Sequence, residues 1–573
     1  MTDRPQGLQR GLTHYGDAAF ARYLRRSFAR STGLSEAMLD RPVVGICASP
    51  SELNNCHRTM GELVEAVRRG ALAGGALPLA FPTVSLGEPF LHPTSLYLRN
   101  LMALDVEEML RAQPLDAVVL VGGCDKTVPA QLMGAVSAGL PAVQLVVGPM
   151  LTGRYRGERL GACTDCRRFW ARYRAGELDA DEIGRVEGRL AVTAGTCAVM
   201  GTASTMACLA EAMGLALPGS AAIPAVHADR LRIAEATGAL AARLAVDPAA
   251  GRRTMRAILD ARVLDNALRV LLALSGSTNA VLHLAAIAGR AGLGLDLRRL
   301  DALSEETPVL VDLKPVGEGY MEDFHAAGGV PALLRELAPL LHRDVPTVDG
   351  RSLAEVLAEP LPEPVDRRVI RPLGDPIAPK GGLVALFGTL APEGAILKRA
   401  AATPALLEHE GRAVVFDGLE DLARRIDDPD LEVTPSDVLV LKNAGPASPA
   451  RMPEAGYLPI PKKLARAGVK DMVRISDARM SGTAFGAVVL HVAPDAASGG
   501  PLGLVRTGDR IRLSVKERRL DLLVEPEELG RRREAWRPPA PPERGWARLW
   551  QEQILQAPEG CDFRCLRGVG EGR

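Results

Sequence analysis

The sequence predicts an α/β protein in which a large N-terminal α/β domain is followed by a smaller, β-rich C-terminal domain. Its 573 residues exceed the roughly 100–200 residues of a common single domain. The first part alternates apolar, β-rich runs with helical patterns, a proline-rich stretch comes next, and short strand-like runs dominate the remainder.

The N-terminal domain is expected to cover residues 1–359. Pro42–Cys47 and Leu115–Val121 are short apolar runs typical of buried strands, whereas Met206–Met213 has a helical pattern. Such alternation is typical of an α/β domain. A linker is expected over residues 360–382, because prolines break regular structure. These prolines are Pro360, Pro362, Pro364, Pro372, Pro376 and Pro379.

The C-terminal domain is expected over residues 383–573, with a C-terminal helix around Trp546–Leu555 that packs on the body or on a second subunit. Ile511–Val515 and Leu520–Val524 alternate apolar and polar residues across a charged turn, which predicts a hairpin. Four more strands are predicted, over Leu383–Phe387, Ala413–Phe416, Asp437–Leu441 and Val473–Ser476.

Charge and composition argue against nucleic-acid and membrane partners. Lysine plus arginine equals aspartate plus glutamate at 69 each, so the chain has no basic field for nucleic acid. Thr127–Gly153, Val192–Ala210 and Val270–Gly289 are long and uncharged, but prolines or polar residues interrupt them, which indicates buried segments. The polar start Met1–Pro5 lacks the apolar core of a secretory signal and predicts a cytoplasmic protein.

One segment places several reactive side chains together. Val118–Pro129 is typical of a buried strand, a glycine turn and a helix that opens with Thr127 as its cap. Cys124, Asp125 and Lys126 would then lie at the carboxyl end of a strand, where open α/β sheets bind ligands. A thiol and a carboxylate offer a soft and a hard ligand to two metals, although a tight turn with a surface ion pair explains the same residues.

The chain has nine cysteines, an odd number that argues against a disulfide framework. Cys56 lies in a polar loop after a predicted strand, and Cys197 lies among small residues before a helix. On spacing alone, a packed thiol explains each. Cys163 and Cys166 have the spacing of a redox or zinc half-site, but no second half stands nearby. No ligand role is predicted for Cys163, Cys166, Cys561 or Cys565.

In their order along the chain, these segments resemble the dihydroxy-acid and sugar-acid dehydratases, the family that also includes 6-phosphogluconate dehydratase. The resemblance spans nearly the whole chain, and we expect the active site between the two domains. Several long motifs in one order are a specific signal. They also include Thr83–Phe90, Ser275–Ala280, Tyr320–Phe324, Ala327–Ala332, Met452–Glu454 and Arg474–Thr483.

The resemblance implies an iron–sulfur cluster held by Cys56, Cys124 and Cys197. It favours a [2Fe-2S] cluster over a [4Fe-4S] cluster. One iron would lack a protein thiolate, which suits a Lewis acid acting on a substrate hydroxyl better than electron transfer. Electron transfer or cluster sensing is the non-enzymatic alternative. A fourth cluster cysteine would favour it, and the sequence indicates none.

The resemblance also implies a magnesium site. Glu88, Asp125 and Glu454 match the family's magnesium ligands, and Lys126 matches a lysine that is carbamylated to offer an anionic oxygen to the same ion. Hard oxygen donors suit magnesium. Without the resemblance, Glu88 and Glu454 would be ordinary solvated carboxylates, and Lys126 would be an ammonium paired with Asp125.

Ser481 matches the family's catalytic base. A serine hydroxyl is hardly ionised at neutral pH, so it needs activation, which a neighbouring magnesium ion would supply. The implied reaction removes the C2 proton with Ser481 while magnesium holds the carboxylate and 2-hydroxyl and the cluster iron accepts the 3-hydroxyl. The enol product then becomes the 2-keto-3-deoxy acid.

Two substrate classes occur in this family: sugar acids such as arabinonate, xylonate, galactonate or gluconate, and the branched-chain dihydroxy acids of amino-acid biosynthesis. Ser85–Pro89 and Ile475–Thr483 look like the sugar-acid members. The branched-chain enzymes typically carry an aspartate-glycine pair at the first place and a phenylalanine before the serine at the second. We therefore expect a sugar-acid substrate, and a homodimer or homotetramer.

The chain departs from the family pattern at three places. Ala447–Arg451 replaces a glycine-rich approach to Glu454 and adds a positive side chain. Thr389 stands where asparagine is usual. His57 and Thr59 follow Cys56 where asparagine and a histidine or small residue are common. These departures concern the cluster environment and substrate preference, whereas the expected ligands and base are all present.

Overall fold

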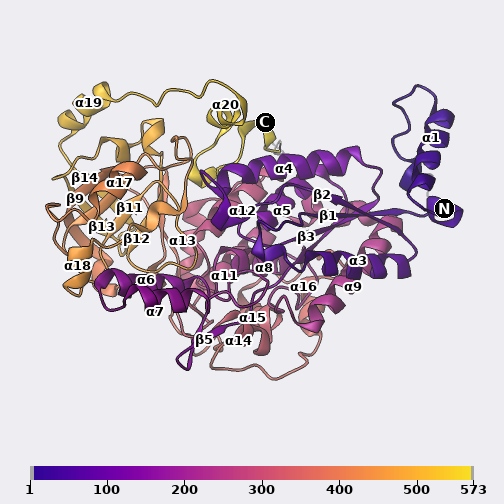
Figure 1. Ribbon diagram of the computed structural model, residues 1–573, viewed down its shortest axis with the longest axis horizontal. Coiled ribbons are helices and arrows are strands. Elements are labelled where there is room, and N and C mark those ends of the chain that lie inside the picture. Colours follow the sequence, from indigo (N-terminus) through magenta and orange to yellow (C-terminus); the bar gives the residue numbers. More distant parts are fainter. Residues whose placement is uncertain (1–4, 569–573) are drawn as a thin grey trace.

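The protein is described here by a computed structural model covering residues 5–568, which folds around two large sheets that lie beside each other (Figure 1). A small two-stranded sheet is formed by β5 (Gly153–Tyr155) and β6 (Glu158–Leu160). Residues 1–4, on which much of the expected polar start falls, lie outside the described residues. The N-terminal sheet is surrounded by helices, and the C-terminal part, orange in Figure 1, contains the larger sheet. The expected α/β fold with a β-rich C-terminal part is confirmed.

The N-terminal sheet consists of four parallel strands in the order β2-β1-β3-β4. Each residue of β1, β3 and β4 is buried, as expected for a parallel sheet that is covered on both faces. Continuous Val, Ile and Leu runs are therefore what these strands need. Their bounds are β1 Val43–Ala48, β2 Leu77–Pro82, β3 Ala117–Gly122 and β4 Ala142–Val146.

Two helix pairs cover this sheet. The helices α3 (Met60–Ala73) and α9 (Ala228–Val246) pack against each other, as do α4 (Ser95–Ala112) and α5 (Thr127–Ala138) (Figure 1). Glycines permit the close approach of α3 and α9. An added Cβ at Gly70 would lie 1.9 Å from the Glu235 carbonyl oxygen.

The uncharged stretches of the sequence form buried helices around the site. Every residue of α8 (Thr202–Ala212) and α12 (Asn279–Arg290) is buried, and α11 (Ala261–Ala273) lies among them. A helix that is apolar on all sides belongs in the interior of a large protein. Among the described residues, no helix is both long and apolar enough to cross a membrane.

The C-terminal sheet has eight strands in the order β14-β13-β9-β10-β11-β12-β8-β7. Its four central strands run parallel, and the outer strands are antiparallel. Each strand predicted for this part is present, including the hairpin of β13 and β14. The bounds are β7 Val384–Leu386, β8 Gly394–Leu397, β9 Glu408–Asp417, β10 Val438–Lys442, β11 Arg474–Ser476, β12 Val488–Ala493, β13 Arg510–Ser514 and β14 Arg519–Leu523.

Residues 360–382 contain no helix or strand in the described structure. Isolated bridges pair Val311 with Ile370 and Val309 with Ala378, so this stretch runs along the N-terminal part. Smaller helices complete the chain. They are α1 Ala18–Ser31, α2 Glu36–Leu39, α6 Thr164–Ala175, α7 Ala180–Glu187, α10 Met255–Ile258, α13 Leu297–Glu306, α14 Met321–Ala326, α15 Gly329–Leu337, α16 Leu353–Ala358, α17 Leu419–Arg425, α18 Lys462–Arg466 and α19 Pro526–Ala535.

The C-terminal helix α20 (Gly545–Gln553) packs on the body, as the sequence predicts. Its Trp550 indole N–H donates to the Pro446 carbonyl over 2.8 Å, and its Trp546 indole N–H donates to the Tyr97 carbonyl over 3.0 Å. The tail therefore ties α4 to the loop that leads to Glu454.

Candidate active site

Three carboxylates from distant segments meet where the N-terminal and C-terminal parts join. One oxygen from each of Glu88, Asp125 and Glu454 lies within 4.8 Å of the others. Glu88 begins a short 3₁₀ turn after β2, and Asp125 follows the carboxyl end of β3. Glu454 opens another 3₁₀ turn in the C-terminal part. The expected ligand carboxylates are thus brought together.

Two buried cations hold these carboxylates. Lys126 Nζ lies 3.2 Å from Glu88 Oε2 and 3.8 Å from Asp125 Oδ2. Arg479 Nη2 lies 3.0 Å from Glu88 Oε1, and Arg479 Nη1 contacts Glu454. Both cationic side chains are almost completely buried. Arg479 lies in the segment Arg474–Thr483, but sequence reasoning assigned it no role.

The charges in this group shift the carboxyl pKa values in opposite directions. Burial disfavours ionisation of Glu88, but Lys126 and Arg479 outweigh it and lower the pKa of Glu88 to about 2. Burial, with help from the charges of Glu88 and Glu454, raises the pKa of Asp125 to about 7 despite Lys126. Three carboxylates facing two cations leave an excess of negative charge. A divalent cation would relieve it, and the hard oxygen donors suit magnesium.

Polar groups of helix α12 border the carboxylates. Asn279 Nδ2 lies 3.4 Å from Glu454 Oε1 and 3.2 Å from Thr202 Oγ1. Its Oδ1 atom is buried and has no hydrogen-bond partner among the described residues. A buried amide oxygen without a partner is costly, so this position suits a bound polar group.

The three predicted cluster cysteines also converge, and all are free thiols. Cys56 lies in the 3₁₀ turn Asn55–His57, and its thiol lies beside that of Cys124. The Cys124 thiol, together with burial, raises the pKa of Cys56 well above its usual value. The Cys163 thiol and burial likewise raise the pKa of Cys197, and the nearby charge of Cys56 acts in the same direction. Cys124 has a left-handed backbone with φ of 74°. Such strain in a non-glycine residue is typical of functional sites.

Cys163, for which the sequence predicts no ligand role, also lies at this site. Its sulfur is 4.0 Å from that of Cys197. It occupies the N-cap position of α6, and Cys166 lies in the first turn of the same helix. Hydrogen bonds from Cys166 and Cys197 lower the pKa of Cys163 to about 3. The sequence signal was the Cys163-Thr164-Asp165-Cys166 spacing, whose third partner, Cys197, is 34 positions from Cys163.

His57 joins two of the cysteine loops. Its Nδ1 donates to the Ser49 carbonyl over 2.9 Å, and its Nε2 accepts from the Gly123 N–H over 3.1 Å. Burial lowers the pKa of His57, although the backbone contacts with Gly123 and Ser49 oppose this shift. An added Cβ at Gly123 would lie 2.1 Å from Val147 Cγ2, so only glycine fits this turn. Sequence reasoning noted His57 as a departure and missed this role.

Ser481 lies in a tightly packed loop after β11. Its hydroxyl is 2.8 Å from the Thr483 hydroxyl. An added Cβ at Gly482 would lie 2.6 Å from Ser277 Oγ, so glycine allows the loop to approach the start of α12. Arg479, two residues earlier, contacts Glu88 and Glu454 and places this loop beside the carboxylates. Neither a carboxylate nor a histidine hydrogen-bonds Ser481 within the described chain, so its activation would require a nearby cation.

The structure corrects the expected cap of α5. The helix starts at Thr127 with Lys126 in the N-cap position, and no side chain caps it. Thr127 Oγ1 is buried and lacks a partner among residues 5–568. Lys126 therefore stands at the helix start with its amine directed to Glu88 and Asp125.

Two of the departures from the family pattern have structural counterparts. In the segment that replaces the glycine-rich approach to Glu454, Arg451 has a φ of 56°, and the following Met452 has a φ of 59°. The Arg451 guanidinium lies 4.3 Å from the centre of the Tyr97 ring. The second departure, Thr389, is hydrogen-bonded to β14. Its N–H donates to Asp521 over 2.9 Å, and its Oγ1 accepts from the Leu522 N–H over 2.9 Å.

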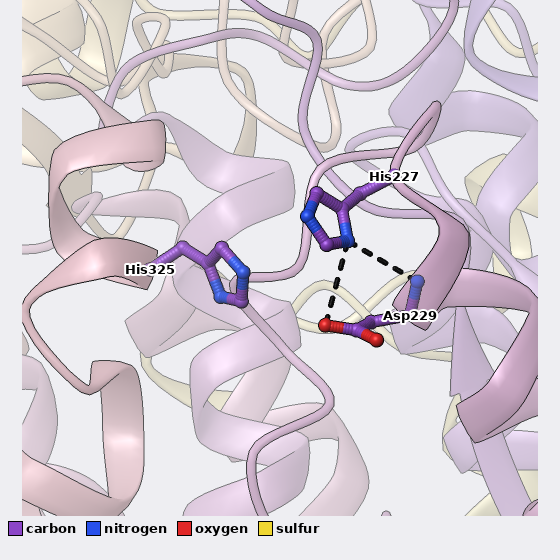
Figure 2. A group of neighbouring side chains, drawn as sticks. All are labelled: His227, Asp229 and His325. Carbon is purple, nitrogen blue, oxygen red and sulfur yellow. Dashed lines mark hydrogen bonds and ion pairs between the residues drawn. The ribbon is translucent and has the colours of Figure 1, made fainter. Parts of the chain in front are cut away.

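A second group of possible metal ligands lies elsewhere. His227, Asp229 and His325 lie at the start of α9 and near the end of α14 (Figure 2). His227 Nδ1 accepts a hydrogen bond from the Asp229 N–H over 3.1 Å and thereby caps α9 (Figure 2). Because this lone pair is used by the cap, the geometry indicates a structural role for the histidine.

Comparison with known proteins matches both parts of the chain. The dihydroxy-acid/6-phosphogluconate dehydratase N-terminal model covers residues 41–356, and the C-terminal model of the same family covers residues 368–561. An L-arabonate dehydratase of Azospirillum brasilense is 46% identical over 96% of this chain and 95% of its own length. A 6-deoxy-6-sulfo-D-gluconate dehydratase of Pseudomonas putida is 45% identical over 93% of this chain and 92% of its own length.

A dihydroxy-acid dehydratase of Carboxydothermus hydrogenoformans is 38% identical over 96% of this chain and 99% of its own length. The matched regions contain the three carboxylates Glu88, Asp125 and Glu454. They also contain the neighbouring cysteines, Cys56, Cys124, Cys163, Cys166 and Cys197. The chain therefore belongs to the dihydroxy-acid/6-phosphogluconate dehydratase family.

Proposed function

We propose that the protein is a hydro-lyase that dehydrates a sugar acid to its 2-keto-3-deoxy acid. The main support is the arrangement at the junction of the two parts. There, three carboxylates and a group of free thiols lie next to the loop that contains Ser481. The relatives named for arabonate and sulfogluconate are 46% and 45% identical, against 38% for a dihydroxy-acid dehydratase. That difference favours the sugar-acid branch.

The proposal includes an iron–sulfur cluster held by Cys56, Cys124 and Cys197, more readily [2Fe-2S] than [4Fe-4S]. These thiols fit such a group because they are free, come from three segments and include the contacting pair Cys56 and Cys124. When bound, the cluster would supply a Lewis-acidic iron to the departing hydroxyl.

The proposal also includes a magnesium ion held by Glu88, Asp125 and Glu454, with a carbamylated Lys126. The excess of negative charge and the unpartnered Asn279 oxygen support a cation with polar ligands at this place. Carbamylation would turn the Lys126 ammonium into an anion and increase that excess. When bound, the ion would supply positive charge to the substrate carboxylate and 2-hydroxyl.

The side chains then have separate tasks. Ser481 takes the C2 proton, and the Thr483 hydroxyl, 2.8 Å away, orients the serine oxygen. Loss of the C2 proton and of the 3-hydroxyl, together one water, leaves an enol, which gains a proton at C3 and loses the proton of its 2-hydroxyl to give the keto acid. Arg479 keeps Glu88 and Glu454 in place during this change.

Turnover of a panel of aldonic acids by anaerobically purified protein tests the function. We expect 2-keto acid from at least one of arabinonate, xylonate, galactonate and gluconate, with a higher kcat/KM than for 2,3-dihydroxy-3-methylbutanoate. Equal or better use of the branched-chain substrate would instead indicate a dihydroxy-acid dehydratase of amino-acid biosynthesis. Inactivity on every acid by protein that contains its cluster would favour an electron-transfer or sensor role. Sedimentation would test the proposed homodimer or homotetramer.

A further inference from the structure

The thiol pocket, formed by Cys56, Cys124, Cys163, Cys166 and Cys197, contains two more thiols than the proposed cluster requires. Cys56 contacts Cys124, and Cys163 lies 4.0 Å from Cys197, sulfur to sulfur. The four thiols therefore form two contacting pairs. Cys166 contacts Cys163 from the adjacent turn of α6.

Two pairs of thiols are the arrangement that a [2Fe-2S] cluster with four cysteine ligands needs, because each iron takes two terminal ligands. Three ligands, as in the proposed function, leave one position without a protein ligand. Cys163 stands beside Cys197, the one assigned thiol that has no assigned partner. We propose that Cys163 is a fourth cluster ligand, which closes the open iron position while substrate is absent. This inference rests on the cluster assignment of the proposed function.

A buried network holds Cys163 in this place. The neighbouring Asp165 accepts from Gly161 N–H over 2.8 Å and from the Tyr320 hydroxyl over 2.9 Å. Lys314 Nζ lies 3.2 Å from the same carboxylate. Thr164 Oγ1 also donates to the Thr483 carbonyl over 3.1 Å, which ties the start of α6 to the loop of Ser481. The position of Cys163 is therefore set by the same loop that carries the proposed base.

The other thiol of the motif serves as a natural control. Cys163 and Cys166 both line a cavity of about 760 Å³ between α6 and the region of α18, so both can be reached by a small reagent. Among the described residues, only Cys163 lies in sulfur contact with Cys197. A ligand role predicts different behaviour for the two thiols, whereas a packing role predicts the same behaviour.

A closing ligand also reconciles four thiols with hydro-lyase chemistry. A permanently closed cluster suits electron transfer, whereas an open iron suits a Lewis acid. If Cys163 yields its position to the substrate, the 3-hydroxyl and the thiol would occupy that position in turn. Substrate should then release Cys163 from the cluster.

Spectroscopy of the anaerobically purified holoprotein tests the ligand. Cys163→Ala and Cys163→Ser should keep iron and sulfide near the wild-type content and shift the visible circular dichroism and the electron paramagnetic resonance of the reduced cluster. Cys166→Ser should keep both spectra, and Cys197→Ser should lose the iron. Unchanged spectra in Cys163→Ala would overturn the inference. Equal loss of iron in Cys163→Ala and Cys166→Ser would assign a packing role and also overturn it.

Alkylation with iodoacetamide, read by peptide mass spectrometry, gives a second readout. Cys163 should be protected several-fold in the holoprotein compared with chelator-stripped protein, and a turned-over aldonic acid should reduce that protection. Cys166 should react alike in all three states. Equal labelling of Cys163 with and without the cluster would overturn this inference but not the proposed function. Absence of iron and sulfide from the wild-type protein would instead overturn the cofactor of the proposed function.

Discussion

His57 accepts a hydrogen bond from the backbone N–H of Gly123 over 3.1 Å and so joins the loop of Cys56 to the turn of Cys124. The other ring nitrogen donates to Ser49, which fixes the ring orientation. One imidazole thus links the two loops that carry these proposed cluster thiols. A glycine at position 123 is needed for this contact, since Val147 leaves no room for a side chain.

We expect His57→Leu to weaken retention of the cluster without unfolding the protein. Side chains that orient metal ligands typically contribute about 10–100-fold in metal affinity. Iron per chain after a fixed incubation with a chelator measures the effect. The half-buried His409 in β9 gives the control His409→Leu, which should keep the wild-type iron content. Equal retention by His57→Leu and wild type would remove His57 from the cluster support.

The sequence indicated the local parts of this site but not their assembly. Apolar runs predicted β3 and its turn because a buried parallel strand needs continuous apolar residues. Arg479 and Glu88 are 391 positions apart, and no local pattern predicts that a guanidinium from the second part balances carboxylates of the first. The resemblance brought Glu454 into the ligand set, whereas geometry alone identified Arg479.

Cys163 shows a different limit of prediction from the sequence. Its spacing to Cys166 was visible, but a half-site was sought within the nearby sequence. The missing partner, Cys197, is supplied by a segment that reaches α6 through tertiary packing. Side-chain periodicity describes one element at a time, so it cannot identify a contact of this kind.

Arg479→Gln should destabilise the metal-free protein, because it leaves Glu88 and Glu454 without their shared cation. Removing one partner of a buried ion pair typically costs about 3–5 kcal/mol. We expect magnesium to restore more of the melting temperature in this variant than in wild type, since the ion would replace the missing charge. Thermal unfolding with magnesium and with chelator measures both effects.

Arg510 provides the control for Arg479. It pairs with Glu410 at the surface, where an ion pair contributes roughly 0–1 kcal/mol. Arg510→Gln should therefore change the melting temperature little, with or without magnesium. A variant of Arg479 that is as stable as the Arg510 variant in chelator would contradict the charge balance described above.

Lys398 should make stability depend on pH. It is buried, its Nζ has no hydrogen-bond partner in the described part of the chain, and burial lowers the pKa of Lys398 from 10.5 to about 7. Between about pH 7 and 10.5 the unfolded chain binds the proton more readily than the folded protein, so stability rises with pH through this window. Below pH 7 the penalty for the buried ammonium is fully present.

Lys398→Met should remove that slope and stabilise the protein at pH 6.5 by an amount on the order of a few kcal/mol. The gain should shrink as the pH approaches 10. Urea unfolding at several pH values measures it, with the exposed Lys516→Met as control. If wild type and Lys398→Met show parallel stability profiles, the amine carries no penalty in the folded state.

Ser481→Ala should abolish turnover while it keeps the fold, the iron and the magnesium. The serine hydroxyl contacts Thr483 and bonds none of the described ligand residues, so its loss leaves the thiols and carboxylates in place. General-base catalysis typically contributes about 10²–10⁴-fold, and loss of a base activated by a metal should fall near the upper end. Thr483→Val should lose less, because it removes only the group that orients the serine oxygen.

The kinetic result needs a readout of proton removal itself. Wild-type protein incubated with substrate in heavy water should exchange the C2 hydrogen if proton removal is reversible, and Ser481→Ala should show no exchange under the same conditions. The exposed Ser436→Ala serves as control and should match wild type in iron content, turnover and exchange. Near-normal turnover by Ser481→Ala would exclude this serine as the base. The proton would then have to pass to another group at the carboxylates, such as a hydroxide bound beside Glu88, Asp125 and Glu454.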